Sequence, residues 1–192
     1  MKKEPIILVG GGGHCHSVID VVECSGRFDI LGIVDMKEQV GRKTLGYEVI
    51  GCDDDLEAIF TDCKNACITV GHIKSNATRL RLFRELKKIG YQLPTIVSPF
   101  AYVSKHSSVG EGTVVMHQAM ININAAVGDN CIINTKSLIE HDVVIEDHCH
   151  ISTASIVNGE SRVMTNTFYG SNAVSRQTAR ISGFVKAGSV VR

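Results

Sequence analysis

A large apolar side chain recurs at every sixth position of this chain from Val103 to Tyr169. A small or short side chain stands two residues before each of them. A helix repeats every 3.6 residues and a strand every 2.0, so neither produces a strict period of six. A hexapeptide repeat is typical of a parallel β-helix, in which each hexad forms one short strand and one corner. The large column is Val103, Val109, Val115, Ile121, Val127, Ile133, Ile139, Ile145, Ile151, Val157, Val163 and Tyr169. The small column is Ala101, Ser107, Thr113, Ala119, Ala125, Cys131, Ser137, Val143, Cys149, Ser155, Ser161 and Thr167.

The repeat also predicts the size of this part of the fold. At three hexads per coil, it gives about five coils of about 18 residues each. We expect the large residues to point inward and the small ones to fit the corners. The pattern weakens at Ser175, recovers at Ile181 and accepts a small residue at Ala187. The last coil is therefore expected to be a weak cap.

Residues 1–98 follow a different pattern. Apolar runs at 6–9, 30–34 and 66–70 read as buried strands, and segments 54–60 and 76–89 read as helices. Alternating strands and helices with glycine at strand ends predict a small parallel sheet of Rossmann type. The predicted fold class is thus an α/β Rossmann-like domain over 1–98, followed by a left-handed parallel β-helix over 99–192.

Composition restricts the function classes. Among 192 residues the formal net charge is zero, which gives no overall field favouring nucleic acid or an anionic membrane. No apolar segment approaches the length of a membrane span. The seven cysteines are an odd number without C-x-x-C spacing, so we expect reduced thiols in a cytoplasmic protein.

The glycine run Gly10–Gly13 lies between a predicted strand and a predicted helix. Backbone amides at such a junction can hold a phosphate or pyrophosphate, although the run also suits a turn that merely needs positive φ. The dinucleotide fingerprint is not met, because its third glycine position is Cys15. Asp35 ends the second strand, where such folds place an acid on a ribose hydroxyl. These features favour a nucleotide or nucleotide sugar over NAD.

Two other groups of polar side chains lie within residues 1–98. His14 and His16 flank the glycine turn and could face a diphosphate or cap the helix. The helix over 76–89 carries a basic face that we expect to be solvated surface. Its members are Arg79, Arg81, Arg84, Lys87 and Lys88.

His141 stands between Glu140 and Asp142 at a predicted corner of the β-helix. A carboxylate bonded to one ring nitrogen raises the basicity of the other, which suits a general base. The alternative is a surface histidine beside chance acids. Gly159 follows 18 residues later, one coil on, and offers a backbone N–H as a donor to an oxyanion.

A zinc site is a competing hypothesis, because some hexapeptide-repeat carbonic anhydrases hold zinc with three histidines across a subunit interface. His141, His148 and His150 lack a compelling ligand spacing. We therefore expect no metal.

A specific combination of motifs covers both halves of the chain. It consists of a strand followed by Gly10–Gly13 and His14, then Ile133-Asn134-Thr135, His141-Asp142 and His150 within the hexapeptide repeat. This combination resembles the sialic-acid and nucleotide-sugar acetyltransferase family of hexapeptide-repeat acyltransferases. Its members include the UDP-4-amino-sugar N-acetyltransferases of bacillosamine synthesis.

The resemblance implies acetyl-CoA as the acetyl donor and a homotrimer with active sites between neighbouring β-helices. It implies His141 as the base, Asp142 as its tuning acid where relatives often have Glu, Gly159 as the oxyanion donor, and His150 near the acetyl group. The implied nucleotide-sugar pocket contains Gly12, Gly13, His14, Asp35 and Gly71. The candidate contacts for CoA are Gly170, Lys186 and Gly188. Lys186 and Arg180, near the last coils, are either contacts for the CoA phosphates or ordinary solvated surface charges. The segment 158–168 departs from the family's glycine-rich repeat.

The sequence therefore predicts an acetyl-CoA-dependent N-acetyltransferase that acts on a nucleotide-linked amino sugar in glycan biosynthesis. Three alternatives remain: O-acetylation of a sialic-acid type of sugar, a γ-carbonic-anhydrase-like metalloenzyme, and a non-catalytic nucleotide-binding module. The sugar and the nucleotide, whether UDP, GDP or CMP, are not specified by these residues.

Overall fold

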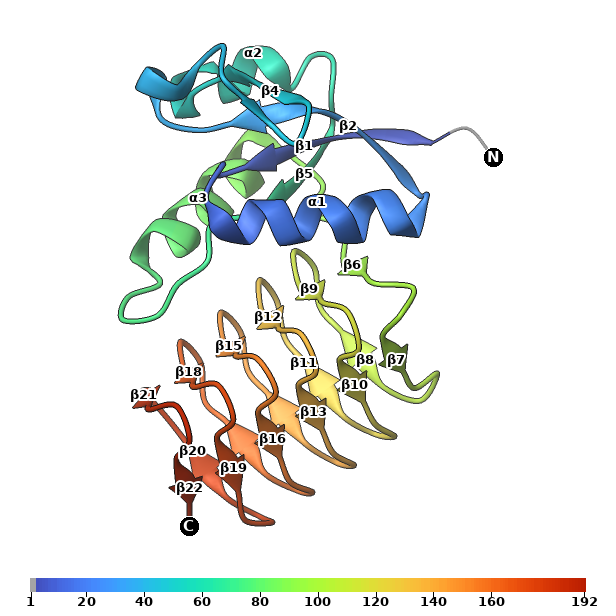
Figure 1. The fold of residues 1–192 in the computed structure, drawn as a ribbon, viewed down its shortest axis with the longest axis vertical. Helices are drawn as coiled ribbons and strands as arrows, with labels where there is room; N and C mark the ends of the chain where they lie inside the picture. Colours follow the sequence, from blue (N-terminus) through green and yellow to red (C-terminus); the bar gives the residue numbers. More distant parts are fainter. Residues whose placement is uncertain (1–2) are drawn as a thin grey trace. The chain divides into compact units, whose positions relative to one another are not determined.

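The computed structural model describes residues 3–192, which divide into two compact units (Figure 1). The first unit extends to Gly71 and resumes over Ala77–Pro94. The second comprises His72–Asn76 and Thr95–Arg192. The short segment His72–Asn76 thus leaves the first unit and belongs to the second.

The first unit is built on a five-stranded sheet in the order β3-β4-β2-β1-β5. Its strands are β1 (Glu4–Val9), β2 (Phe28–Val34), β3 (Lys43–Thr44), β4 (Tyr47–Gly51) and β5 (Asn65–Ile68). Strands β4, β2, β1 and β5 are parallel, as the Rossmann-type pattern predicts. The short β3 is antiparallel to β4, and the sequence did not reveal this hairpin. Its two-residue turn, Leu45-Gly46, has positive φ at both positions, as a primed hairpin turn requires.

Two longer helices pack on this sheet, and three shorter helical turns connect its strands. They are α1 (Gly13–Ser25), η1 (Lys37–Gln39), η2 (Asp53–Asp55), α2 (Leu56–Ile59) and α3 (Ala77–Ile89). Helix α1 buries Val18, Ile19 and Val22 completely and ends at Gly26, which adopts the left-handed conformation typical of a helix C-terminus.

Arg79 corrects the expectation of a solvated basic face on α3. Its side chain is only 1% exposed. Its guanidinium donates to the carbonyl oxygens of Ile68 at 2.6 Å and Val70 at 3.0 Å. A buried arginine needs such partners for its charge, so Arg79 secures the end of β5 rather than meeting solvent.

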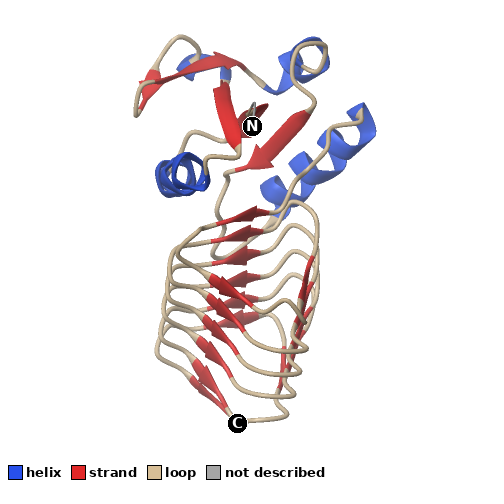
Figure 2. Cartoon of the chain, turned by 90° about the vertical axis from the view of Figure 1, so that its right-hand side faces the viewer, coloured by secondary structure: helices blue, strands red, loops and turns tan. Residues whose placement is uncertain are grey.

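The second unit is a left-handed β-helix whose strands form three parallel sheets (Figure 2). The first sheet contains β6 (Ile96–Val97), β9 (Val114–Val115), β12 (Ile132–Ile133), β15 (His150–Ile151), β18 (Phe168–Tyr169) and β21 (Phe184–Val185). The second contains β7 (Tyr102–Val103), β10 (Met120–Ile121), β13 (Leu138–Ile139), β16 (Ile156–Val157), β19 (Val174–Ser175) and β22 (Val190–Val191). The third contains β8 (Ser108–Val109), β11 (Ala126–Val127), β14 (Val144–Ile145), β17 (Arg162–Val163) and β20 (Arg180–Ile181).

The predicted columns form the core of the β-helix. Each strand pairs with the strand 18 residues later, as in Met120 with Leu138 and Ile121 with Ile139. From Val115 to Tyr169 the large column is at most 4% exposed, and the small residues between Thr113 and Thr167 are buried beside it. Cys131 and Cys149 lie in this column, and all seven cysteines are free thiols.

Successive corners of the β-helix, on all three of its edges, use a left-handed backbone conformation. Twelve residues spaced six apart from Gly112 to Thr178 have φ between 52° and 66°. This conformation costs little for Gly and is tolerated by Asn and Asp, and these three residue types together hold six of the twelve positions. The corner residues therefore form a third repeated column, which the sequence analysis did not identify.

The last coil departs from the predicted spacing. Phe184 pairs with Phe168 and Val190 pairs with Val174, both after 16 residues instead of 18. A turn at Gly183, with φ of 72°, shortens the coil. Val185 therefore packs against the core where the repeat placed Ala187, and Ala187 is exposed.

Among residues 3–192, no helix combines the length and apolar character that a membrane crossing requires.

The corner column predicts a stabilising substitution at Thr178. This β-branched residue is exposed and has φ of 58°, a conformation that Asn adopts more easily. Thr178→Asn should raise the free energy of unfolding by about 1 kcal/mol in denaturant titrations. Gln177→Asn, at the adjacent exposed position without positive φ, is the control and should give no gain. An equal gain in both variants would contradict this explanation.

Candidate functional site

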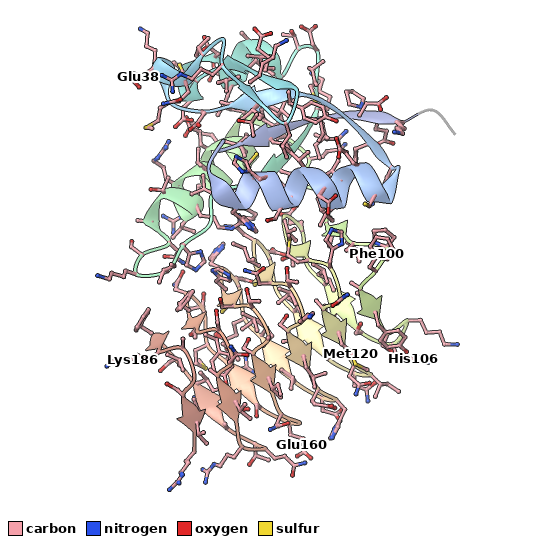
Figure 3. The ribbon with its side chains drawn as sticks, viewed as in Figure 1. Glu38, Phe100, His106, Met120, Glu160 and Lys186 are labelled. Carbon is pink, nitrogen blue, oxygen red and sulfur yellow. The ribbon has the colours of Figure 1, made fainter. Side chains whose placement is uncertain are left out.

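His141 lies at the vertex of the β-helix between β13 and β14. The neighbouring Asp142 is one of the left-handed corner residues, with φ of 60°, and its backbone N–H bonds the carbonyl of Ile123 in the preceding coil. This corner directs both side chains outward, and their side chains are 41% and 47% exposed. Glu160 lies at the same vertex one coil later (Figure 3).

His141 and Asp142 form a hydrogen-bonded pair. The distance from His141 Nδ1 to Asp142 Oδ2 is 2.8 Å, so Nδ1–H donates to the carboxylate and Nε2 is left as the basic nitrogen. Asn124 donates to the other carboxylate oxygen of Asp142 at 3.2 Å. Glu140 accepts from Asn122 at 2.9 Å and from the His141 backbone N–H at 3.2 Å.

The sequence analysis missed Asn122 and Asn124. Each stands 18 residues before the acid that it holds, so the coil period itself was the signal that would have located them. Their amides fix the carboxylates on both sides of His141.

The acidic surroundings tune the imidazole. The hydrogen bond to Asp142 raises the pKa of His141, partial desolvation opposes the rise, and the charges of Asp142, Glu140 and Glu160 add to it. The same hydrogen bond, followed by that from Asn124, lowers the pKa of Asp142. At neutral pH Asp142 is therefore an anion, and the histidine is a stronger base than an isolated imidazole.

Gly159 lies directly over the His141 ring. A methyl group at Gly159 would come within 2.7 Å of both Cε1 and Nε2 of His141. The backbone of Gly159 shows no positive φ, so the conformation does not demand glycine. The absence of a side chain instead keeps the basic nitrogen uncovered.

His150 lies far around the coil from His141. It points outward from β15, and only 7% of it is exposed. In a triangular coil, the vertex between two sheets is opposite the third sheet, and β15 belongs to that third sheet. The structure therefore brings His141, Asp142 and Gly159 together but holds His150 on another side of the same chain.

The residues predicted to contact CoA lie in the last two coils. Gly170 is buried, and a methyl group there would meet the backbone of Lys186 and Ala187, so close packing explains this glycine. Lys186 and Gly188 are exposed, and Lys186 projects away from the last coil (Figure 3). Arg180 is also exposed and stacks above Arg162 in the third sheet.

The first unit has a pocket of about 310 Å³ at the carboxyl ends of its parallel strands. Strand β1 lies between β2 and β5, and the order of the strands reverses at this point. The pocket lies there, which is the usual place for ligands in such sheets. The lining residues are Val9, Gly10, Val34, Asp35, Met36, Lys37, Glu38, Cys52, Asp53, Asp54, Val70, Thr78, Arg81 and Leu82.

Of the predicted nucleotide-sugar residues, only Asp35 lines this pocket. A methyl group at Gly11 would come within 2.6 Å of the Asp35 carboxylate, so the glycine turn and the acid are in contact. Gly12 and Gly13 are exposed at the start of α1, and nothing lies within 4 Å of the space that a side chain would take.

His14 packs beside Gly71, at 3.4 Å from the position that a Gly71 methyl group would occupy. His14 and Gly71 are therefore neighbours in the fold, although neither lines the pocket.

Several pocket residues were missed by the sequence analysis, chiefly those after β2 and β4. Lys37 lies in η1, a turn too short to show an apolar pattern, and Asp54 lies in η2, at the start of a segment that the sequence identified only as a helix. Arg81, expected to be solvated, donates to Asp53 at 2.6 Å and to Glu85 at 2.8 Å. The hydrogen bond to Asp53 is the main cause of a raised pKa of Arg81. This ion pair joins α3 to the loop after β4 along the pocket wall.

The histidines considered for zinc are not gathered. His141 and His148 lie at different vertices, and His150 lies on a sheet face. Within residues 3–192, no three His, Cys, Asp or Glu side chains are placed to hold a metal ion.

Comparison with known proteins gives the family context of this geometry. Residues 5–86 match the PglD N-terminal domain family. The acetyltransferase domain of PglB from Neisseria gonorrhoeae is 26% identical, with a TM-score of 0.91 over 99% of this chain and 92% of that one. No curated protein sequence matches the chain.

Structures from Caulobacter crescentus give a second match. PerB, and a histidine-to-asparagine mutant of perosamine N-acetyltransferase, were each solved with CoA and GDP-perosamine. Both are 30% identical to this chain, with a TM-score of 0.91 over 98% of it and 88% of theirs. WeeI from Acinetobacter baumannii, at 17% identity and a TM-score of 0.74, shares the fold. With this identity over nearly the full length, the chain belongs to the hexapeptide-repeat family of nucleotide-sugar acetyltransferases and is an acyltransferase.

Proposed function

We propose that the protein transfers an acetyl group from acetyl-CoA to the amino group of a nucleotide-linked amino sugar. The observation that carries this proposal is the His141–Asp142 pair with Gly159 directly over the basic nitrogen. Relatives support the substrate classes, since structures of PerB contain CoA and GDP-perosamine and the PglB domain has been solved with acetyl-CoA.

His141 acts as the general base of a direct transfer. The sugar amine attacks the thioester carbonyl carbon, and Nε2 of His141 takes the proton from the amine nitrogen. The Gly159 N–H donates to the oxyanion, the C–S bond breaks, and the proton passes to the CoA thiolate. A thioester is already activated, so positioning, one base and oxyanion donors suffice without a covalent enzyme intermediate.

The active site lies between copies of the chain. Within one chain the vertex with His141 is opposite the sheet with His150, so the two cannot meet one acetyl group. The face made by β7 to β22 lies between the His141 vertex and the vertex with Asn134. In a homotrimer, three β-helices pack with this face toward a common three-fold axis. The His141 vertex of one copy then lies against the Asn134 vertex of the next copy.

That face has the composition of an interface. All six of its outward strand positions are apolar: Tyr102, Met120, Leu138, Ile156, Val174 and Val190. Met120 marks its outer surface in Figure 3. Tyr102 is 58% exposed and Val190 71%, a continuous apolar ladder that soluble monomers seldom expose. A closed homotrimer buries the ladder.

The nucleotide occupies the first unit. Asp35 binds a ribose hydroxyl beside the pocket, and the bare N-terminus of α1 at Gly12 and Gly13 receives the diphosphate. The pocket wall is rich in carboxylates, so the phosphates belong at the helix N-terminus rather than inside the pocket.

The deciding experiment is a thiol-release assay with acetyl-CoA and a panel of UDP-, GDP- and CMP-linked amino-deoxy sugars. Transfer to at least one amino sugar is expected. Release only with a hydroxyl acceptor such as sialic acid would establish O-acetylation instead, and no release with any acceptor would overturn the proposal.

Removal of the base should suppress the reaction. His141→Ala is expected to lower kcat about 10²–10⁴-fold, the usual contribution of a general base.

Asp142→Asn tests whether Asp142 raises the pKa of His141. The base works unprotonated, and Asp142 raises its pKa, so wild-type kcat/KM should rise with pH through a value above about 6.5. In the variant this rise should move to lower pH and reach a lower plateau. An unshifted profile would contradict the assigned pair.

Gly159→Ala should separate activity from stability. The three atoms nearest to the added methyl group all belong to the half-exposed His141 ring, so the free energy of unfolding should change by less than about 1 kcal/mol. Because the ring must move, kcat should fall about 10²-fold or more. Gly128→Ala, whose methyl group meets the backbone of Glu146 and Asp147, is the contrasting control and should chiefly lower stability. Full activity of Gly159→Ala would refute the proposed geometry.

Gly13→Asp tests the diphosphate site. Helix α1 has no acid in its first turn, so a carboxylate there should stabilise the helix by roughly 0.5 kcal/mol. The same charge should repel the diphosphate and weaken nucleotide-sugar binding at least about tenfold in calorimetry. Ser17→Asp, one turn further along the exposed side of α1, should leave affinity unchanged. Equal affinities in the two variants would move the diphosphate elsewhere.

A further inference from the structure

We propose that His150 is a positioning residue that acts through Asn134, and that the Asn134 carboxamide donates to the thioester carbonyl oxygen of acetyl-CoA. This inference rests on the proposed function. It gives the vertex with Asn134 a role in binding the acetyl group, opposite His141 of the neighbouring copy. Asn134 then becomes a second hydrogen-bond donor to the oxyanion, in addition to the N–H of Gly159.

The orientation of the Asn134 carboxamide is fixed by a backbone donor. The N–H of Thr135 donates to Asn134 Oδ1 at 2.8 Å, and a backbone N–H has no other role. The opposite end of the carboxamide, Nδ2, therefore faces His150 Nε2 at 3.0 Å. A flipped carboxamide would lose both bonds.

The same contacts define the tautomer of His150. Asn134 Nδ2 only donates, so His150 Nε2 accepts and carries no proton. The carbonyl oxygen of His72 only accepts, so Nδ1 carries the proton and donates across 2.7 Å. A proton on Nε2 would set two donors face to face. Both ring nitrogens thus form hydrogen bonds within the chain. The bond to the His72 carbonyl orients the ring, and the ring in turn orients the Asn134 carboxamide.

Aromatic neighbours hold the ring in place. His72 meets it edge-on, with ring centroids 5.3 Å apart and planes at 67°, and Phe168 does so at 5.2 Å and 85°. His150 is only 7% exposed, so it cannot swing out to a bound molecule without breaking these contacts. Asn134 is half-buried at the edge of the same network, and in this proposal its second Nδ2 hydrogen bonds the thioester carbonyl oxygen.

The segment His72–Asn76 supplies the carbonyl that starts this relay. Asn76 anchors it, because Asn76 Nδ2 donates to Asn166 Oδ1 at 2.7 Å and to the carbonyl of His148 at 3.3 Å. The loop between β5 and α3 thereby contributes to the acyl site of the second unit, to which its residues belong.

A double-mutant cycle tests the relay. Asn134→Ala should lower kcat about 10²-fold, the range for one lost oxyanion donor. His150→Ala should lose somewhat less, and the double variant should be no slower than Asn134→Ala alone, because His150 acts only through Asn134. His150→Gln keeps an acceptor for Asn134 and should recover part of the loss. His106→Ala, at an exposed histidine of the same β-helix, is the control and should keep wild-type kcat.

Losses that multiply in the double variant would show that His150 meets the substrate independently and would overturn the inference. A ¹⁵N NMR measurement decides the tautomer without any substrate. Wild-type protein should show the proton of His150 on Nδ1, and Asn76→Ala should increase exchange at that site. A proton on Nε2 would overturn the inference even if acetyl transfer is established. If wild-type protein transfers no acetyl group, the proposed function fails separately.

Discussion

The hydrogen-bond register between successive coils underlies most of this structure. Each strand of the β-helix pairs with the strand 18 residues later, so the residue above any side chain is known from its number. This register stacks the apolar column into a core and the corner residues into an edge. It also brings Gly159 over His141 and sets Asn124 beside Asp142. The site is thus a consequence of coil stacking.

Missing side chains matter at both sites as much as those present. A side chain at Gly159 would cover the base, and one at Gly11 would collide with Asp35. Asp142 shows the reverse case, in which backbone conformation selects the side chain. Its left-handed corner tolerates a short acid, and the side chain still reaches the imidazole at 2.8 Å. The shorter reach compared with Glu is therefore no handicap at this corner.

The polar contacts around the two histidines support the different roles that we propose for them. At His141 a carboxylate takes one ring nitrogen and leaves the other to a reactant. At His150 a carbonyl and a carboxamide take both, and two aromatic rings fix the plane. Exposure follows the same division, because a base must meet its substrate whereas a positioning group is better held away from it.

The sequence alone determined the two fold types, the inward column and the His141–Asp142–Gly159 group, because strict periodicity converts sequence spacing directly into spatial neighbours. It could not determine the shortened last coil, the β3–β4 hairpin or the burial of Arg79, since each depends on local turns or on carbonyls from distant strands. The His150 relay was also hidden, because His72 and Asn134 are joined only by tertiary folding. In a periodic segment, the repeat spacing predicts which residues are in contact. In a non-periodic segment, the contacts depend on tertiary folding and cannot be predicted from the spacing.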